Sequence, residues 1–307
     1  MMSSERRHTY RFVQVDVFTN RIFGGNPLAV FLDARGLNDG DMQSIANEMN
    51  LSETTFVFPP SEPNHAAKVR IFTPNAELPF AGHPTVGTAW VLGDQRMIPA
   101  GATSMVLELG VGPIPVRAEQ TENGEFVWMD QGTATFGNVV EGREAVAYAL
   151  GLEIDDLLSD APVQQASTGS PFLYVPLKDM ETVDRVSPRL DAYRECIDQA
   201  GQGVRSAFMF APDPENNRAY ARMIGVGRGM LREDPATGSA NGPMGAYLVK
   251  YGLAQSDVMV EILSEQGTAM GRQSFIHLRV ESQNGQPGRV QVGGQVVPVF
   301  EGELRLG

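Results

Sequence analysis

The chain has 307 residues, a formal net charge of −13 and 42% hydrophobic residues. This length and composition are typical of a globular protein with two domains of ordinary size. The negative charge disfavours nucleic acid and anionic membranes as partners, because both require a basic surface. It does not exclude a small anionic substrate, because backbone N–H groups bind anions locally.

Cysteine and histidine usage indicates a reducing compartment and no metal site. Cys196 is the only cysteine, so no intramolecular disulfide can form, and its apolar helical neighbours predict a buried structural thiol. The four histidines lack zinc-binding spacing. No apolar run approaches the ~20 residues that span a bilayer, and residues 1–9 lack the apolar segment of a signal peptide. We therefore expect a cytoplasmic protein.

The first part of the chain predicts many strands and two helices. Alternating or continuous apolar runs predict strands at residues 10–18, 28–32, 56–58, 67–72, 104–109, 114–118 and 126–130. A turn is predicted at residues 23–27. One helix, carrying Met42, Ile45 and Met49, is expected after a cap at Asp39 or Asp41. A second helix is expected over residues 81–92, after a loop at 75–80.

The pattern loosens around residues 130–138, where we place a domain junction. Beyond it, helices are predicted at 142–150, 154–158 and 187–200, and from 237 onward. Strands are predicted at 162–166, 172–176, 204–211, 220–224, 258–264, 274–280, 290–292 and 296–300. Many antiparallel strands with one long helix per half indicate an α+β fold. The expected domains are 1–130 and 131–300, with a last strand at 301–307 returning to the first.

One polar, glycine-punctuated stretch, residues 232–242 (REDPATGSANG), runs directly into an apolar helical pattern. The first N–H groups of a helix have no intrahelical acceptor, and the helix dipole adds partial positive charge there. Such a helix start binds anions. We expect Ser239 to cap this helix, Gly238 to let a ligand approach the backbone, and Asp234 to place a carboxylate at the rim. The competing interpretation is an ordinary capped helix.

A second copy of the arrangement favours the site. Residues 70–74 end a strand, residues 75–80 form a loop, and Gly82 and His83 open a helix. Two such helix starts, facing each other, would form a cleft with positive ends on both sides. We expect a small carboxylate substrate there.

Four segments together resemble the phenazine-biosynthesis PhzF isomerase family: residues 23–30 (FGGNPLAV), 42–56 (MQSIANEMNLSETTF), 70–89 (RIFTPNAELPFAGHPTVGTA) and 233–242 (EDPATGSANG). The resemblance spans nearly the whole chain. It implies a fold similar to that of diaminopimelate epimerase, with two pseudo-symmetric domains. Each wraps a twisted, mostly antiparallel sheet around a central helix, and the active site lies between them. It also implies that no cofactor is needed and that the protein is a homodimer.

The resemblance also assigns roles to individual residues. Glu53 is expected to carry the proton, with His83, Asp234, Gly238 and Ser239 around the substrate. Which of His83 and Asp234 handles protons stays open. On position alone, the rival interpretations are a surface turn residue for Glu53, a helix cap for His83 and a turn former before proline for Asp234. The family motif favours catalysis for Glu53.

Three further residues complete the expected substrate-binding set: Asn26, Ser52 and Gly82. Turn chemistry is the rival interpretation for Asn26 and Ser52. The epimerases and racemases of this fold resemble two-base enzymes with a cysteine at each helix start. In this chain those places hold His83 and Ser239, which excludes racemisation by two thiols.

We therefore expect a cofactor-independent isomerase that moves a proton between carbons of a small carboxylate through Glu53. The expected reaction is similar to that of dihydro-3-hydroxyanthranilate isomerase in phenazine biosynthesis. Two alternatives remain. One is an amino-acid epimerase or racemase with other bases. The other is a binding protein that retains the site without catalysis.

Overall fold

The computed structural model describes residues 8–99, 101–227, 229–255 and 258–306. The chain divides into two compact units, Met1–Met129 with Gly294–Gly307, and Asp130–Gly293. The expectation that residues 1–9 lack a signal peptide concerns residues that lie mostly outside the described ranges. The last residue of the expected strand at 301–307 also lies outside them.

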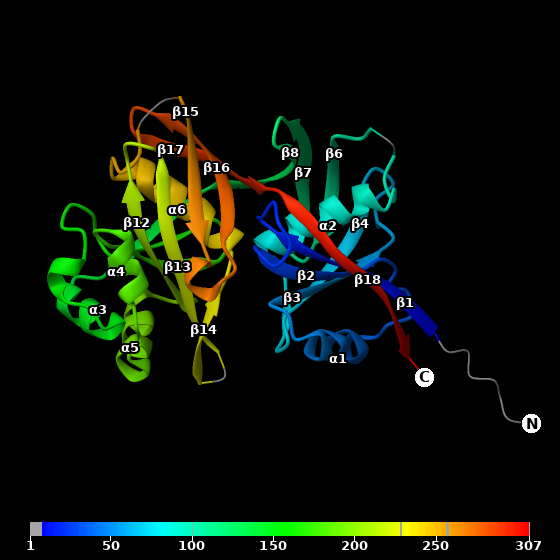
Figure 1. The fold of residues 1–307 in the computed structure, drawn as a ribbon, viewed down its shortest axis with the longest axis horizontal. Helices are drawn as coiled ribbons and strands as arrows, with labels where there is room; N and C mark the ends of the chain where they lie inside the picture. The colour runs from blue at the N-terminus through cyan, green and yellow to red at the C-terminus, as the bar shows by residue number, and fades with distance from the viewer. Residues whose placement is uncertain (1–7, 100, 228, 256–257, 307) are drawn as a thin grey trace, which may run out of the picture. The chain divides into compact units, whose positions relative to one another are not determined.

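The first unit is a twisted sheet with two helices (Figure 1). Its strands are β1 (His8–Val17), β2 (Asn26–Phe31), β3 (Glu53–Phe58), β4 (Ala67–Phe72), β5 (Glu77–Leu78), β6 (Ser104–Leu109), β7 (Gly112–Thr121), β8 (Gly124–Thr133, continuing past the unit boundary) and β18 (Val296–Leu306). Its helices are α1 (Asp39–Met49) and α2 (Gly82–Asp94). β1 pairs antiparallel with β2 and β18, β2 pairs parallel with β3, and β3 pairs antiparallel with β4.

The helix α2 is the core element of the first unit. Nearly all of its residues from Gly82 to Leu92 are buried, as expected of a helix that is apolar all round. It packs against β1, β2 and β3. A Cβ at Gly87 would lie 2.7 Å from side-chain atoms of Leu28 and Val17. Glycine at this position therefore lets the helix approach the sheet closely.

The opposite face of the same sheet packs against α1. Phe31, Phe56 and Phe72 join Met42 and Ile45 of α1 in one buried cluster. Phe31 and Phe56 stack, with ring centroids 5.1 Å apart. Because side chains alternate along a strand, Phe56 on this face leaves Glu53, Thr55 and Val57 of β3 on the face toward α2.

The second unit repeats the plan with more helices. Its strands are β9 (Thr135–Val139), β10 (Gln164–Ser167), β11 (Pro171–Pro176), β12 (Ser206–Asp213), β13 (Arg218–Gly227), β14 (Met230–Asp234), β15 (Met259–Gln266), β16 (Ser274–Gln283) and β17 (Gln286–Gly294, whose last residue belongs to the first unit). Its helices are α3 (Arg143–Leu150), α4 (Met180–Arg185), α5 (Leu190–Ala200) and α6 (Gly238–Lys250), with short 3-10 turns at Ile154–Asp156 and Thr268–Met270.

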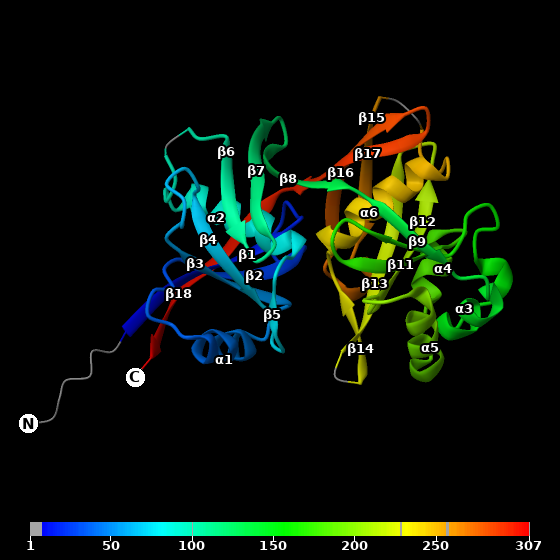
Figure 2. The same cartoon turned by 180° about the vertical axis from the view of Figure 1, so that it is seen from behind.

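The helix α6 occupies the same place in this unit as α2 does in the first. Its residues from Ala240 to Val249 are buried, and strands of the same unit surround it (Figure 1, and from behind in Figure 2). The helices α3 and α5 pack against each other in a second cluster with β11 and β12. Cys196 lies in that cluster, where burial raises the pKa of its thiol to about 11. The prediction of a buried structural thiol is confirmed.

The α+β prediction, with one central helix per half, is confirmed. Several local predictions were wrong. The cap of α1 is Asn38, whose side chain accepts from the Asp41 N–H, while the Asp41 side chain accepts from the Asn38 N–H. The helix α5 begins at Leu190 rather than at residue 187.

Four elements were not predicted from the sequence. They are β5, β9, β14 and α4. All are short or polar, and the sheet pairing or packing that stabilises them cannot be read from the segment itself. Residues 296–300 and the described part of 301–307 form one strand, β18, because both pair with β1 through a single register shift. Among the described residues, no helix has the length and apolarity to cross a membrane.

Candidate functional site

The sheet of the first unit places Glu53 at the start of β3, on the face toward α2. Its Cα pairs in register with Leu28 of β2, and its side chain is only 15% exposed. A carboxyl group in such a place is largely shielded from water by the surrounding protein.

The imidazole of His83 lies beside Glu53. His83 is the second residue of α2, is 4% exposed, and places Nε2 3.3 Å from Oε2 of Glu53. Within the described structure, Nε2 makes no hydrogen bond of ordinary geometry. The two groups are therefore close, but their geometry is not that of an ordinary hydrogen bond.

Burial decides the charge of this histidine. It lowers the pKa of His83 to about 3, so the imidazole is neutral at physiological pH. A distance of 3.3 Å to a carboxylate would suit an ion pair only if His83 were protonated. We conclude that the pair is a carboxyl group beside a neutral imidazole. Depending on its tautomer, the imidazole can donate a hydrogen bond to Glu53 or accept one from it.

Buried hydroxyl groups hold α2 and β3 together next to this pair. The hydroxyl oxygens of Thr55 and Thr88 are 2.9 Å apart, and Thr85 donates to the carbonyl of Ala81 at 2.7 Å. The Thr55–Thr88 contact links β3 to α2, while the Thr85 bond lies within the first turn of α2 and its cap. Gly87 lets α2 approach β1 and β2 closely. Glu53 and His83 are thus carried by two elements that pack directly against each other.

Asn26, Ser52 and Gly82 accompany the pair. Asn26 is the first residue of β2, fully buried, and adjacent in the sheet to the strand that carries Glu53. Ser52 is half-buried and directly precedes β3. Gly82 is the buried first residue of α2. All five expected residues of the first unit thus lie at or next to the starts of β2, β3 and α2.

The remaining expected residues, Asp234, Gly238 and Ser239, belong to the second unit. Asp234 ends β14 and Gly238 begins α6. The expectation that Ser239 caps this helix was wrong. The cap is Thr237, and its hydroxyl donates to Asp234 Oδ2 instead of bonding a helix N–H. The first helical bonds come from Ala240 and Asn241 to the Thr237 carbonyl, so the N–H groups of Gly238 and Ser239 precede them.

The turn before α6 is pressed against the end of β15. At Gly267 the backbone has φ +78°, and a Cβ there would lie 2.5 Å from the carbonyl oxygens of Pro235 and Arg272. We predict that Gly267→Ala lowers the free energy of unfolding by about 1–3 kcal/mol, through backbone strain and this clash. Urea unfolding measures the loss. Gly271→Ala is the control, because its positive φ of 71° brings a similar strain but no atom lies within 4 Å of the added Cβ. If both variants lose the same stability, the close approach at Gly267 has no effect.

Two residues at this turn were missed by sequence reasoning. Thr237 was included only as one residue of the glycine-punctuated stretch 232–242 and was given no role. Gln266 lies 29 positions further along the chain and is fully buried. Its one sequence signal is its place in the alternating buried face of β15, after Val260, Ile262 and Ser264. That signal predicts burial but no role.

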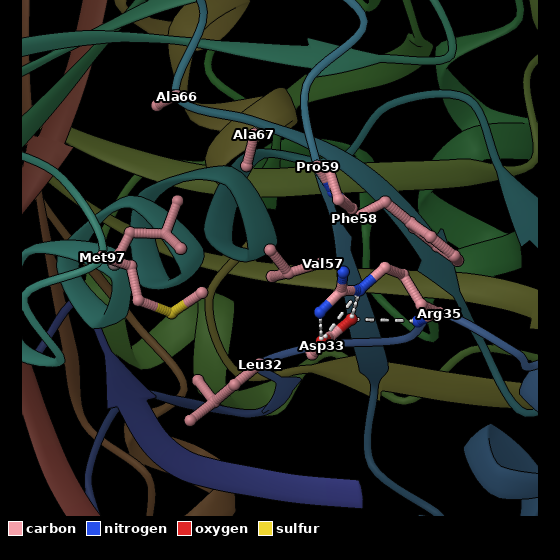
Figure 3. Close-up of a pocket in the computed structure, with 10 residues that line it drawn as sticks. Leu32, Asp33, Arg35, Val57, Phe58, Pro59, Ala66, Ala67 and Met97 are labelled. Carbon is pink, nitrogen blue, oxygen red and sulfur yellow. Dashed lines mark hydrogen bonds and ion pairs between the residues drawn. The ribbon is translucent and has the colours of Figure 1, made fainter.

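A separate pocket in the first unit, of about 220 Å³, contains none of the expected site residues (Figure 3). Its walls are mainly apolar, with Leu32, Val57 and Met97 among them. The charged groups at its rim, Asp33 and Arg35, bind each other through both carboxylate oxygens. A pair that satisfies itself offers little to a ligand, so we assign no function to this pocket. In the part of the chain that the structure describes, no cluster of His, Cys, Asp and Glu could hold a metal ion.

Comparison with known proteins shows which family this chain resembles. The family model described as phenazine biosynthesis-like protein matches residues 15–302. The trans-2,3-dihydro-3-hydroxyanthranilate isomerase of Pseudomonas chlororaphis is 36% identical over 299 residues, covering 97% of this chain and 100% of that protein. The crystal structure of a PhzF-family phenazine biosynthesis protein of Bacillus anthracis has a TM-score of 0.86 and 29% identity. It covers 97% of this chain and 99% of that one.

A more distant neighbour shares the fold alone. A probable proline racemase of Agrobacterium radiobacter has a TM-score of 0.64 at 12% identity, and covers 97% of this chain and 93% of that one. The expected epimerase-like architecture is thereby confirmed.

Proposed function

The chain belongs to the phenazine biosynthesis-like protein family and is an isomerase, and from this premise we propose that it moves a proton between two carbons of a small carboxylate through Glu53. The observation that carries the proposal is the Glu53–His83 pair: a nearly buried carboxyl group 3.3 Å from the Nε2 of an imidazole that burial keeps neutral. A carboxylate placed in this way can act as a general base and, once protonated, as a general acid.

In the proposed reaction, Glu53 breaks a C–H bond at a carbon conjugated to a carboxylate-bearing ring or alkene. The electron pair of that bond delocalises into the conjugated system, and the proton forms an O–H bond on Glu53. Glu53 then gives the proton to another carbon on the same face. The N–H groups at the starts of α2 and α6 would stabilise the charge of the intermediate.

In this proposal, His83 hydrogen-bonds to Glu53 and does not itself transfer a proton. A cationic imidazole at this distance would hold Glu53 as a carboxylate and make it a weak base. A neutral imidazole carries no net charge and can hydrogen-bond either form of the carboxyl group. Proton transfer is therefore assigned to Glu53 and hydrogen bonding to His83.

Substrate contacts are proposed at Asn26, Ser52, Gly82, Gly238 and Ser239, with Asp234 binding an amino or hydroxyl group. The proposal also includes catalysis without a cofactor, a homodimer and a cytoplasmic location. Sedimentation velocity tests the dimer.

The proposal is tested with dihydro-3-hydroxyanthranilate in D₂O, followed by NMR. We expect isomerisation by the purified chain without added metal or cofactor. Because a single carboxyl group carries the proton, some hydrogen should pass between the two carbons without exchange with solvent. Deuterium at an α-carbon with inversion of configuration, on an amino-acid substrate, would instead favour the epimerase alternative. Tight binding without turnover would favour the binding protein.

A further inference from the structure

The fully buried amide of Gln266, at the end of β15, uses all its hydrogen-bonding capacity on the turn before α6. Its Nε2 donates to the Asp234 carbonyl at 2.8 Å and to Thr237 Oγ1 at 3.1 Å. Its Oε1 accepts from the Thr237 N–H at 3.1 Å and from Asn241 Nδ2 at 2.9 Å. Two donors and two acceptor positions are thus filled, which is the full capacity of an amide side chain. Gln266 therefore ties the end of β14 to the first turn of α6.

These bonds also set the direction of a hydrogen bond at Asp234. An amide nitrogen can only donate, so Thr237 Oγ1 is an acceptor toward Gln266. The hydroxyl hydrogen of Thr237 is then available for Asp234 Oδ2, 2.5 Å away. The hydrogen bonds thus run in the order amide, hydroxyl, carboxyl, with each group donating to the next. Asp234 Oδ2 is held in place as a hydrogen-bond acceptor.

The backbone around this chain of bonds is constrained from both sides. On one side, Gly267 brings the end of β15 against Pro235. On the other, Arg222 holds Glu233, the residue before Asp234, through Nε and Nη2 at 2.9 and 2.7 Å. Arg222 Nη1 also binds carbonyl groups at the end of α4, including that of Val186 at 3.0 Å. Asp234 consequently has little freedom to adopt another orientation.

We infer that Gln266 and Thr237 are positioning residues, which hold Asp234 as an acceptor for a donor group of the substrate. This inference rests on the proposed isomerase function. Asp234 then binds an N–H or O–H group of the substrate and does not donate a proton through Oδ2, so proton transfer falls to Glu53. The substrate class narrows to acids that carry an amino or hydroxyl group near the reacting carbons.

The first test compares Thr237→Val with Thr237→Ser. Valine keeps the volume but removes the hydroxyl, so Asp234 loses its fixed orientation. We expect kcat/KM for dihydro-3-hydroxyanthranilate to fall by about 10–100-fold. Serine restores the hydroxyl, and the rate should return to within roughly threefold of wild type. A purely structural role of the Thr237 methyl group predicts the reverse order. A Thr237→Val variant with wild-type kcat/KM would overturn the inference.

A matched pair of buried glutamines separates positioning from stability. Gln266→Glu replaces the Nε2 donor with an oxygen, so that the Thr237 hydroxyl turns from Asp234 to the new carboxylate. Gln164 is a buried glutamine of the same unit, and it bonds Gly137 and Tyr251 instead. We expect both Gln→Glu variants to lower the unfolding midpoint, but only Gln266→Glu to lower kcat/KM. An equal loss of kcat/KM in both variants contradicts the inference.

A substrate-independent measurement distinguishes failure of this inference from failure of the proposed function. In Gln266→Met, the Thr237 amide loses its acceptor, and its hydrogen exchange should become at least tenfold faster than in wild type, while amides of α2 stay protected. Unchanged exchange at Thr237 overturns the inference even if the enzyme is active. Wild type could fail to isomerise the substrate while Gln266→Met still exchanges the Thr237 amide faster than wild type. In that case the proposed reaction fails, and the role of Gln266 in holding the turn is supported.

Discussion

Glu53→Gln is expected to lower kcat for dihydro-3-hydroxyanthranilate by about 10³-fold or more, because the only proposed proton carrier is lost. Glutamine has the same shape and can still accept a hydrogen bond, but it cannot take up a proton at neutral pH. Substrate binding should therefore change by no more than roughly threefold. Steady-state assays at saturating substrate give kcat, and calorimetric titration gives the dissociation constant.

The control for this variant is Glu48→Gln, on the exposed face of α1. It removes the same charge without touching β3 or α2, and kcat should be that of wild type. The assignment fails if Glu53→Gln isomerises the substrate at the wild-type rate. It also fails if Glu53→Gln loses so much free energy of unfolding that much of it is unfolded under the assay conditions. The loss in kcat would then reflect poor folding rather than impaired chemistry.

The second large effect is a loss of stability in mild acid that depends on His83. The reference pKa of a histidine is 6.5, and burial lowers the pKa of His83 to about 3. Between these values the unfolded chain binds a proton that the folded chain does not. Lowering the pH therefore favours unfolding. The contribution of His83 is complete above pH 6.5 and declines toward pH 3, by about 1.4 kcal/mol per pH unit.

This prediction is measured as a difference in slope. Urea unfolding of wild type and His83→Gln, at several pH values between 4.5 and 6.5, gives the free energy of unfolding as a function of pH. Wild type should lose about 1.4 kcal/mol more per pH unit than the variant. Burial also lowers the pKa of His277, but that residue contributes to both proteins and cancels in the difference.

The exposed His8, at the start of β1, provides the matched control. His8→Gln should leave the slope of wild type unchanged, because the side chain lies on the surface and its removal disturbs no buried contact. Parallel slopes for wild type and His83→Gln would mean that His83 is protonated in the folded protein. The pair with Glu53 would then be an ion pair, and Glu53 a weaker base than we propose.

Elements with strong periodicity could be predicted almost to the residue. Ala67–Phe72 and Ser104–Leu109 are strands with the bounds expected from their apolar pattern. The elements that were missed, such as β14 and α4, are stabilised by pairing or packing with other segments of the chain. β14 exists because residues 223–227 offer it an antiparallel edge, and nothing within residues 230–234 alone indicates a strand.

The site shows the same division. The glycine-led starts of α2 and α6 and the residues Glu53, His83 and Asp234 could be proposed from local sequence and family resemblance. The charge of His83 could not, because it depends on how completely the surrounding elements exclude water. The role of Gln266 could not either, because its four bonds join positions 234 to 241 to a residue at the far end of another strand.

By itself, the sequence determined the fold class, the family and the chemical groups available for acid–base work, since these follow from composition, periodicity and long matching strings. Only the tertiary structure decided which of those groups are buried, which are neutral and which way their hydrogen bonds run. The physical reason is that burial and hydrogen-bond geometry arise from contacts between residues far apart in the chain. A linear pattern carries no record of those distances.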